Sequence, residues 1–215
     1  MSIHILTDKS VSQKIINLQP IIDMSKKQEI LDAAIRLFAN KDFRDASMAE
    51  LSESTGVAPS TIFYHFKTKE DLFLAILKKF REDIIFEFTR HTQNHVYQSG
   101  LAMAEGIIAF YLQLASSMEE RFLLLHRHDA YELARTNDEC REHLEAIYDC
   151  LVDMFDKAIR RGQEDGSVRP AASRKTALIL FSMVDSLVRL QTYRLYDAGS
   201  LYRDLIENCQ KILKN

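Results

Sequence analysis

Glycine, proline and cysteine are scarce in this sequence, and tryptophan is absent. Its 215 residues include 6 Gly, 3 Pro, 3 Cys and no Trp. So few turn-forming residues, together with the lack of alternating strand patterns, favour helices throughout the chain. The glycines are too dispersed to form a phosphate-binding loop, and the common nucleotide-binding and hydrolase motifs do not occur. The sequence therefore predicts an all-α protein without a recognisable catalytic motif.

The three cysteines are Cys140, Cys150 and Cys209, and they form no C-x-x-C pair. An odd number of unpaired thiols is typical of buried side chains in a reducing compartment. The alternative is a redox sensor, which would need an exposed thiol with a lowered pKa. No basic and apolar leader opens the chain, and no uncharged apolar run approaches ~20 residues. We therefore expect a soluble, cytoplasmic protein that does not enter a membrane.

The overall charge is close to neutral. The net charge is −3, and 47% of the residues are hydrophobic and 27% charged, which suits one or two globular domains. This balance excludes a uniformly basic coat for nucleic acid, but it leaves room for a local DNA-binding face. Acids and bases are nearly equal over residues 26–90, so affinity for DNA would depend on a few placed contacts.

Residues 47–72 (SMAELSESTGVAPSTIFYHFKTKEDL) are the most informative stretch. Ser47 and Glu50 have the spacing of a capping box, which predicts that a helix begins at the next residue, Met48. Gly56 supplies the backbone freedom for a sharp turn, and Pro59 fits the first turn of a second helix. Two short helices around a glycine turn are typical of a helix-turn-helix motif.

The second helix of this motif has a buried stripe formed by Ile62 and Phe66. Its other faces carry short hydroxyls and aromatic rings instead of the Glu and Lys of a solvated helix: Ser60, Thr61, Phe63, Tyr64 and His65. Helical periodicity alone leaves open an ordinary helical hairpin within a bundle, because it specifies helices and not grooves.

Two segments, ILDAAIRLFANKDF (30–43) and SMAELSESTGVAPSTIFYHFKTKEDLF (47–73), resemble the N-terminal DNA-binding domain of the TetR family of bacterial transcriptional regulators. The resemblance covers residues 27–87. One departure is Asp42, where the family usually has glycine, and we expect a left-handed turn there with some strain. Another is the pair Pro59 and Ser60, which should change base preference and not the fold.

The resemblance implies a ligand-responsive regulator, by family default a repressor, that binds a palindromic operator as a homodimer and is not an enzyme. It implies residues 24–70 as a three-helix DNA-binding domain and residues 71–215 as a helical domain for effector binding and dimerisation. Residues 1–23 are either a genuine extension or the result of an upstream start site. We expect a double-stranded DNA operator and a small hydrophobic effector as partners, and no cofactor or metal.

Family positions carried onto this sequence assign the DNA contacts. Those expected to approach base edges or thymine methyl groups are Pro59, Ser60, Thr61 and Phe63. Those expected to reach phosphates are Ser47, Tyr64, His65, Lys67 and Lys69.

Beyond a fourth helix at residues 69–87, amphipathic helices are expected over 101–118, 120–133, 138–162, 171–196 and 201–213. Between them we expect a mostly apolar pocket with a few polar groups. The candidate lining residues are Met103, Phe110, Tyr111, His126, Tyr148, Met154, Phe181 and Asp185. The alternative is that these side chains simply fill the core. Asp185 is then a carboxylate satisfied by a neighbouring helix. His126 and His128 make a poor metal pair because residues at i and i+2 point apart on a helix.

The resemblance implies that the last two helices form the dimer interface, and their apolar surface, which exceeds what one core requires, agrees with this. The interface candidates are Leu180, Val184, Leu187, Leu201 and Leu205. Two other functions stay open at this point. One is a helical enzyme or ligand carrier with a vestigial helix-turn-helix, and the other is a nucleoid protein that binds DNA without an effector.

Overall fold

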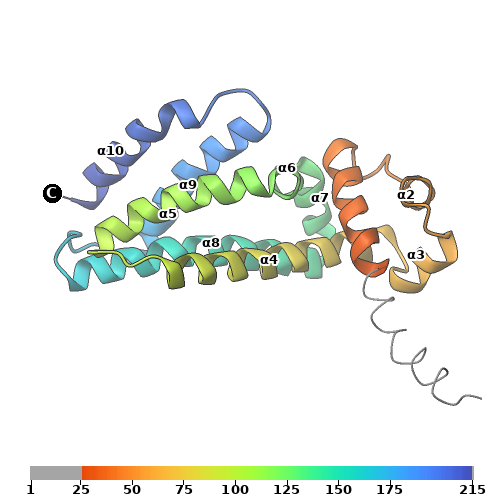
Figure 1. The fold of residues 1–215 in the computed structure, drawn as a ribbon, viewed down its shortest axis with the longest axis horizontal. Helices are drawn as coiled ribbons and strands as arrows, with labels where there is room; N and C mark the ends of the chain where they lie inside the picture. The colour runs from red at the N-terminus through yellow and green to blue at the C-terminus, as the bar shows by residue number, and fades with distance from the viewer. Residues whose placement is uncertain (1–25, 215) are drawn as a thin grey trace, which may run out of the picture. The chain divides into compact units, whose positions relative to one another are not determined.

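The computed structural model describes residues 26–214, and every regular element in that range is a helix, as Figure 1 shows. This confirms the all-α prediction. The expected extension at residues 1–23 lies outside the described residues. The chain divides into two compact units between Phe73 and Leu74. That division falls inside one long helix, α4 (Lys69–Asn94), so a single helix begins in the first unit and continues into the second.

The first unit holds a helix at residues 26–40, then α2 (Met48–Thr55), α3 (Pro59–His65) and the start of α4. Its core includes an aromatic triangle of Phe38, Phe43 and Phe73. The ring centroid of Phe43 lies 5.3 Å from that of Phe38 and 5.2 Å from that of Phe73, and both pairs are edge-to-face. Such aromatic pairs add stability beyond the area that they bury. The triangle fixes the loop after the first helix against the start of α4.

The turn at Asp42 is not left-handed, so the strain expected there is wrong. Among the described non-glycine residues, only Arg194 has a positive φ, at 55°. The turn closes instead through the carbonyl of Asp42, which accepts hydrogen bonds from the backbone N–H groups of Asp45 and Ala46, both at 3.0 Å. The chain therefore leaves the first helix without the glycine that the family usually has at this point.

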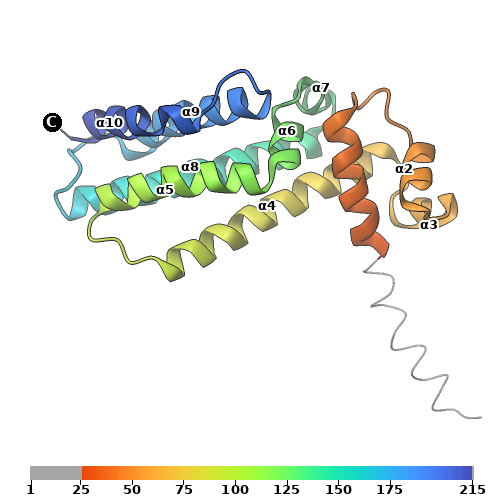
Figure 2. The ribbon, with the colours of Figure 1, turned by 45° about the horizontal axis from the view of Figure 1, so that its top comes forward.

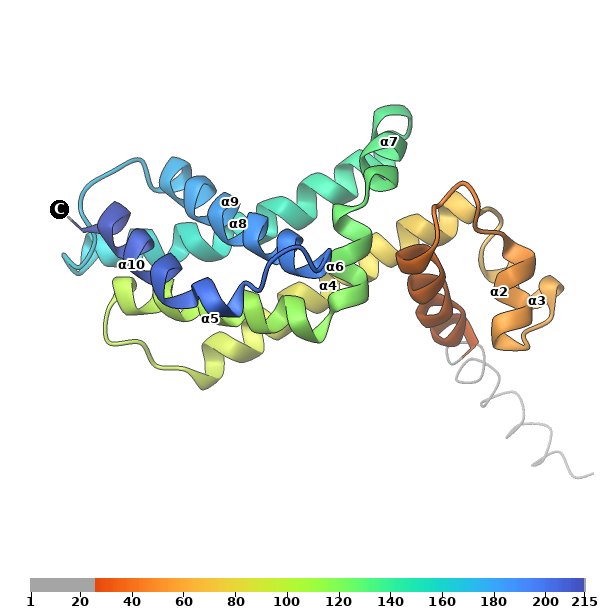
Figure 3. The ribbon, with the colours of Figure 1, turned by 90° about the horizontal axis from the view of Figure 1, so that it is seen from above.

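The second unit contains the rest of α4 and the remaining helices. These are α5 (Gly100–Ser117), α6 (Glu119–His126), α7 (His128–Thr136), α8 (Asp138–Glu164), α9 (Ser173–Thr192), a 3-10 turn η1 (Gly199–Leu201) and α10 (Tyr202–Leu213). The long helix α8 is the centre of this unit and packs against α5, α7 and α9 (Figures 2 and 3). The single helix expected over 120–133 is in fact two, because Arg127 has an extended backbone (φ −71°, ψ 146°) that separates α6 from α7.

Two glycines allow α5 and α8 to approach closely. A Cβ atom added to Gly100 would lie 2.0 Å from the backbone nitrogen of Gly162 and 2.6 Å from the carbonyl oxygen of Ala158. The side chain of Asp165 accepts a hydrogen bond from the Gly100 N–H at 2.7 Å, and Ser167 accepts one from Leu101 at 3.1 Å. The first N–H groups of α5 are thus satisfied by the loop that follows α8.

α5 is also long and apolar enough, by length and composition, to cross a membrane, with a mean hydropathy of 1.2 over 18 residues. Half of that window is buried within the protein. Nine of its positions are buried, among them Met103, Ile107 and Tyr111. A helix that packs in this way against α8 and α9 has the composition expected of a core helix.

Candidate nucleic-acid interface and effector site

The capping box predicted at Ser47 is present. The Glu50 N–H donates to Ser47 Oγ at 3.2 Å, and the Ser47 N–H donates to Glu50 Oε2 at 2.9 Å. The ammonium of Lys41 pairs with the same carboxylate. The hydrogen bond from Lys41, followed by those from Ser47, lowers the pKa of Glu50. The start of α2 is therefore fixed by side chains on both sides of the helix terminus.

The turn of the motif is held by hydroxyl groups that the sequence did not single out. Gly56 adopts φ 68°, and its N–H donates to the carbonyl of Ser52 at 2.9 Å. Ser52 Oγ donates to the carbonyl of Val57 at 2.7 Å. Thr55 Oγ1 donates to the carbonyl of Leu51 at 2.7 Å and accepts from the Val57 N–H at 3.2 Å. The sequence signal for these hydrogen bonds is the presence of Ser and Thr beside the turn glycine, because short hydroxyl side chains bond to nearby backbone groups.

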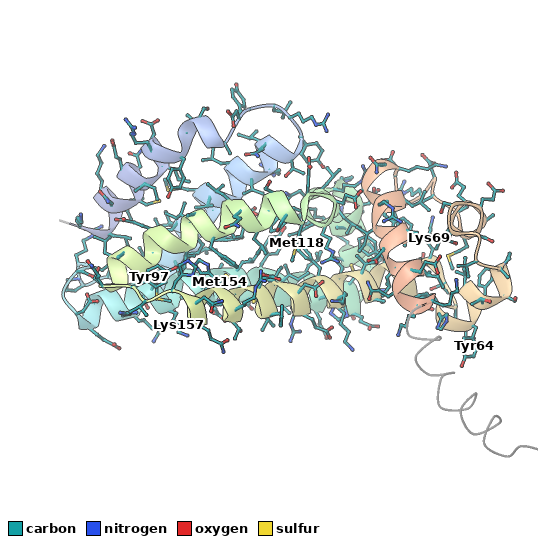
Figure 4. The ribbon with its side chains drawn as sticks, in the orientation of Figure 1. Tyr64, Lys69, Tyr97, Met118, Met154 and Lys157 are labelled. Atoms are coloured by element: carbon teal, nitrogen blue, oxygen red, sulfur yellow. The ribbon has the colours of Figure 1, made fainter. Side chains whose placement is uncertain are left out.

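The helix α3 buries one side and exposes the residues expected to read DNA. Ile62 and Phe66 are buried, with 0% and 3% of their surface exposed. Phe63 and Tyr64 are 46% and 67% exposed, and Figure 4 shows Tyr64 pointing away from its unit. Of the other candidates, Ser47, Pro59, Ser60 and Lys67 are exposed, and Thr61 and His65 are half-buried. Exposed aromatic side chains on a short helix indicate a contact surface.

Lys69, which was expected to reach phosphate, has hydrogen-bond partners within its own unit. Its ammonium donates to the backbone carbonyls of Phe43, Arg44 (3.2 Å) and Ala46 (2.9 Å). It also lies 4.5 Å from the centroid of the Phe43 ring. A lysine has three N–H donors, and three carbonyls account for them. Lys69 therefore holds the loop at residues 43–46 against the start of α4.

We expect Lys69→Met to destabilise the protein by about 1–3 kcal/mol, because it leaves half-buried carbonyl groups without a donor. The measurement is urea unfolding followed by circular dichroism. Lys67→Met is the matched control, since Lys67 is exposed and a surface substitution of this kind changes stability by less than about 0.5 kcal/mol. Equal effects of the two substitutions would contradict the role given to Lys69.

A buried polar group lies in the second unit, where α5, α6 and α9 meet. The hydroxyl of Tyr111 donates to Asp185 Oδ1 at 2.7 Å, and His126 Nε2 lies 3.1 Å from the same oxygen. Tyr111 is fully buried, and the side chains of His126 and Asp185 are 1% and 18% exposed. The expectation of a carboxylate satisfied by neighbouring helices is confirmed, and the partners are Tyr111 and His126.

Aromatic side chains surround this group. The Phe181 ring lies 6.0 Å from both Tyr111 and Tyr148 in edge-to-face geometry. The hydroxyl of Tyr148 is hydrogen-bonded to that of Tyr131. Burial, and next the nearby Asp185, raises the pKa of Tyr111 well above its usual value, and burial followed by the bond to Tyr131 raises the pKa of Tyr148. We call the set of Tyr111, His126, Tyr131, Tyr148, Phe181 and Asp185 the aromatic–acid cluster.

Five of the eight predicted lining residues belong to this cluster, and three do not. Phe110 faces α4 instead, with its ring centroid 5.9 Å from Phe88 and 4.5 Å from His91. It points away from Tyr111 because successive helical residues are turned by about 100°. Met103 and Met154 are 5% and 1% exposed and fill the core; Figure 4 shows Met154 inside the helical unit. Tyr131 is the member that the sequence analysis missed, and no local pattern singled it out.

A small cavity lies about one helical turn beyond Tyr111 on α5 and Asp185 on α9, and no member of the aromatic–acid cluster lines it. Its volume is about 80 Å³, and it lies between α5, the start of α6 and the end of α9. Its walls include Ala115, one helical turn after Tyr111, and Val188, almost one turn after Asp185. The other lining residues are Leu112, Ser116, Glu119, Gln191 and Thr192.

Three of the proposed dimer residues are buried within their own chain. Leu180 and Val184 are 0% exposed and Leu205 is 5% exposed. They are therefore wrong as surface residues, because α9 and α10 bury these sides against the rest of the unit. Leu187 is half-buried, and Leu201 is 38% exposed. The apolar residues that α9 does expose are Leu178 and Ile179, at 53% and 54%.

No group of three or more metal-ligating side chains occurs within residues 26–214. His126 and His128 belong to different helices, and His128 lies at the surface, 3.5 Å from Glu132. Burial raises the pKa of the Cys140 and Cys209 thiols to about 11. The pKa of Cys150 also rises to about 11, through burial and next the charge of Asp153. These thiols are protonated at neutral pH, which favours packing over redox sensing.

Fold and surface together define a helix-turn-helix DNA-binding protein with an all-helical second unit. Residues 30–76 match the family model described as "Bacterial regulatory proteins, tetR family". The "Fatty acid metabolism regulator protein" of Bacillus subtilis is 22% identical over 191 residues, which are 85% of this chain and 92% of that protein. The repressor AcnR of Corynebacterium glutamicum is 42% identical over 55 residues, 26% of this chain and 29% of that one. The helix-turn-helix unit of the chain therefore belongs to the TetR family.

Solved structures show the same fold. The structure of the regulator FadR from Bacillus subtilis in complex with stearoyl-CoA superposes with a TM-score of 0.72 at 19% identity, covering 87% of this chain and 99% of that one. A regulator from Saccharomonospora viridis in complex with choline gives a TM-score of 0.72 at 20% identity, over 86% and 95% of the two chains.

Proposed function

We propose that this protein is a ligand-responsive transcriptional repressor that acts in the cytoplasm as a homodimer on a palindromic operator. The observation that carries the proposal is the surface of α3, which buries Ile62 and Phe66 and presents hydroxyl and aromatic side chains. The second helix of a helix-turn-helix motif enters the major groove with such residues toward the base edges. The proposal assigns no enzymatic reaction to the chain.

The candidates on this surface fall into two groups with different roles. Pro59, Ser60, Thr61 and Phe63 lie toward the bases, where hydroxyl groups accept or donate and apolar atoms meet thymine methyl groups. Ser47, Tyr64, His65 and Lys67 reach phosphates, which fix the register of the protein on the duplex. Because few basic residues are involved, phosphate contacts should contribute only a small part of the affinity for DNA. The dependence of that affinity on salt concentration measures this part.

Two copies are needed because one such motif reads too few base pairs for useful specificity. A two-fold interface must be self-complementary, and α9 offers a suitable patch in Leu178 and Ile179. Neighbouring apolar side chains that stay exposed in one chain commonly mark a site of association. Leu187 of α9 and Leu201 of η1 stay in the proposed interface.

The response to a ligand is proposed to pass from the aromatic–acid cluster to α4 through α6. On α6, Phe122 lies 5.7 Å from the Tyr111 ring and 5.2 Å from the Phe80 ring of α4. Beside it, Arg121 donates to Asp83 of α4 at 2.6 Å. A ligand that shifts α6 would therefore shift α4, whose first residues belong to the helix-turn-helix unit. The coupling need only be ~1–3 kcal/mol to change operator affinity 5- to 150-fold.

Two substitutions test the proposal on an operator selected from random DNA. Lys67→Ala should weaken binding about equally on all sequences and lower the slope of log K against log salt by about one, because one phosphate contact is lost. Thr61→Ala should instead change which bases are preferred at one or two positions of each half-site. Both are measured by fluorescence anisotropy at several salt concentrations. If neither variant differs from the wild type, α3 is not the DNA-reading helix.

A further inference from the structure

We propose that the aromatic–acid cluster selects an organic cation, an amine or quaternary ammonium group on an apolar body, as its ligand. This inference rests on the proposed effector site and gives it a ligand class. The charge comes from Asp185, and the walls come from the rings of Tyr111, Tyr148 and Phe181.

Within residues 26–214, one carboxylate oxygen of Asp185 accepts hydrogen bonds, and the other does not. Both of its hydrogen bonds, from Tyr111 and from His126 Nε2, end on Oδ1. Within the described part of the chain, Oδ2 has no hydrogen bond, and no lysine or arginine lies within 4.0 Å of the carboxylate. The side chain is nevertheless only 18% exposed. A carboxylate that is this little exposed and bonded to a phenol and an imidazole, with no described lysine or arginine beside it, favours a ligand that brings a positive charge.

The rings around Asp185 suit the same ligand. Phe181 lies between Tyr111 and Tyr148, 6.0 Å from each. A cation over an aromatic face is attracted by the ring quadrupole, and several rings together form the cage that binds ammonium groups. Burial keeps the two phenols neutral, as the raised pKa of each indicates. The acidic group of the cluster is the carboxyl of Asp185, which accepts the hydrogen bond of the Tyr111 phenol.

The remaining charged groups near the cluster do not favour an anion. Arg189 follows Asp185 by one helical turn, and its positive charge acts to lower the pKa of Tyr148, but its side chain is exposed. His126 Nε2 is bonded to Asp185, while its Nδ1 is buried without a hydrogen-bond partner. In the tautomer protonated only at Nε2, Nδ1 is an acceptor, which matches the N–H donor of a protonated amine. The small cavity beyond the cluster contains a second carboxylate, Glu119, and no lysine or arginine.

Exposure increases across the cluster in a way that suggests an entrance. Tyr111 is fully buried, Tyr148 is half-buried, and Tyr131 on the short helix α7 is 42% exposed. Breaking the hydrogen bond between the hydroxyls of Tyr131 and Tyr148 would open the side of the cluster that lies nearest to solvent. The neighbouring cavity of about 80 Å³ has apolar walls at Leu112, Ala115 and Val188 that fit part of an alkyl chain. A larger ligand requires the helices around the cavity to separate.

The test uses three probes with the same twelve-carbon chain and different charge: dodecyltrimethylammonium, dodecanol and dodecanoate, each below its micelle concentration. Binding to the full-length protein without DNA is measured by isothermal titration calorimetry. We expect the cation to bind at least tenfold more tightly than the alcohol, and the anion to bind most weakly. Asp185→Asn, which keeps the size of the side chain, should remove the preference for the cation.

Asp153→Asn is the matched control. Asp153 lies on the exposed face of α8 and pairs with Arg174, so its loss should leave the preference intact. Tyr148→Leu removes one ring of the cage and should lower the preference, which gives a second test if Asp185→Asn does not fold. Equal binding of the three probes, or a preference that survives both Asp185→Asn and Tyr148→Leu, would overturn the inference. Cation binding that fails to release operator DNA would leave the ligand class standing and refute the proposed switch.

Discussion

Replacing Ile179 by glutamate should convert the protein to a monomer and lower its affinity for the operator by about 100-fold or more, because the two half-sites would no longer be bound together. Ile179 is 54% exposed on α9 beside Leu178. In a two-fold interface each copy would place this carboxylate near the axis, where like charges repel and lose their water. Light scattering at micromolar concentration and operator titration are the measurements.

The control is Ile85→Glu, which makes the same change at an isoleucine that is 42% exposed on α4. It should leave the oligomeric state unchanged, since α4 is not part of the proposed interface. A wild-type monomer at micromolar concentration, or an Ile179→Glu dimer with full operator affinity, would refute the assignment of this surface. Dimerisation through α4 would instead appear as a monomer for Ile85→Glu alone.

Replacing Gly100 by alanine should destabilise the protein by about 3 kcal/mol or more, because a close backbone contact cannot be relieved by moving a side chain. The new Cβ would lie 2.0 Å from the nitrogen and 2.3 Å from the Cα of Gly162. To accommodate it, the start of α5 must move away from α8, which also disturbs the hydrogen bond from the Gly100 N–H to Asp165. Urea unfolding followed by circular dichroism measures the loss.

Gly199→Ala is the matched substitution at a permissive position. A Cβ atom there would meet only the side chain of Asp197, at 3.1 Å from Oδ1, and that side chain is exposed. Alanine also restricts the unfolded chain, so the net change should stay within about 1 kcal/mol. If Gly100→Ala is tolerated as well as Gly199→Ala, the close approach of α5 and α8 is not needed for stability.

The helix-turn-helix was predictable because its determinants are local. The capping box of Ser47 and Glu50, the turn at Gly56 and the proline at the start of α3 each act over a few residues. These local signals would have the same effect in any protein. The resemblance to family residues supports the same interpretation. The exposure of Phe63 and Tyr64 follows from the helical period once Ile62 and Phe66 are buried.

The second unit was predictable as helices but not as a set of contacts. Five of its eight expected lining residues meet in one cluster, yet Phe110 turns toward α4 while its neighbour Tyr111 bonds to Asp185. Periodicity predicts which residues share a face of a helix, and it does not say which other helix that face will meet. For the same reason, Leu180 and Val184 are apolar residues of α9 that lie on its buried side.

What the sequence alone determined, then, is the all-α class, the start and turn of the DNA-reading motif, and the chemical character of its exposed face. Tertiary structure alone decided three features. Lys69 holds the loop at residues 43–46, Gly100 lies against Gly162, and Asp185 is hydrogen-bonded to Tyr111 and His126. The reason is distance along the chain: each pairing joins residues that are far apart in sequence, and only the packing of whole helices brings them within the few ångströms over which hydrogen bonds and steric contacts act.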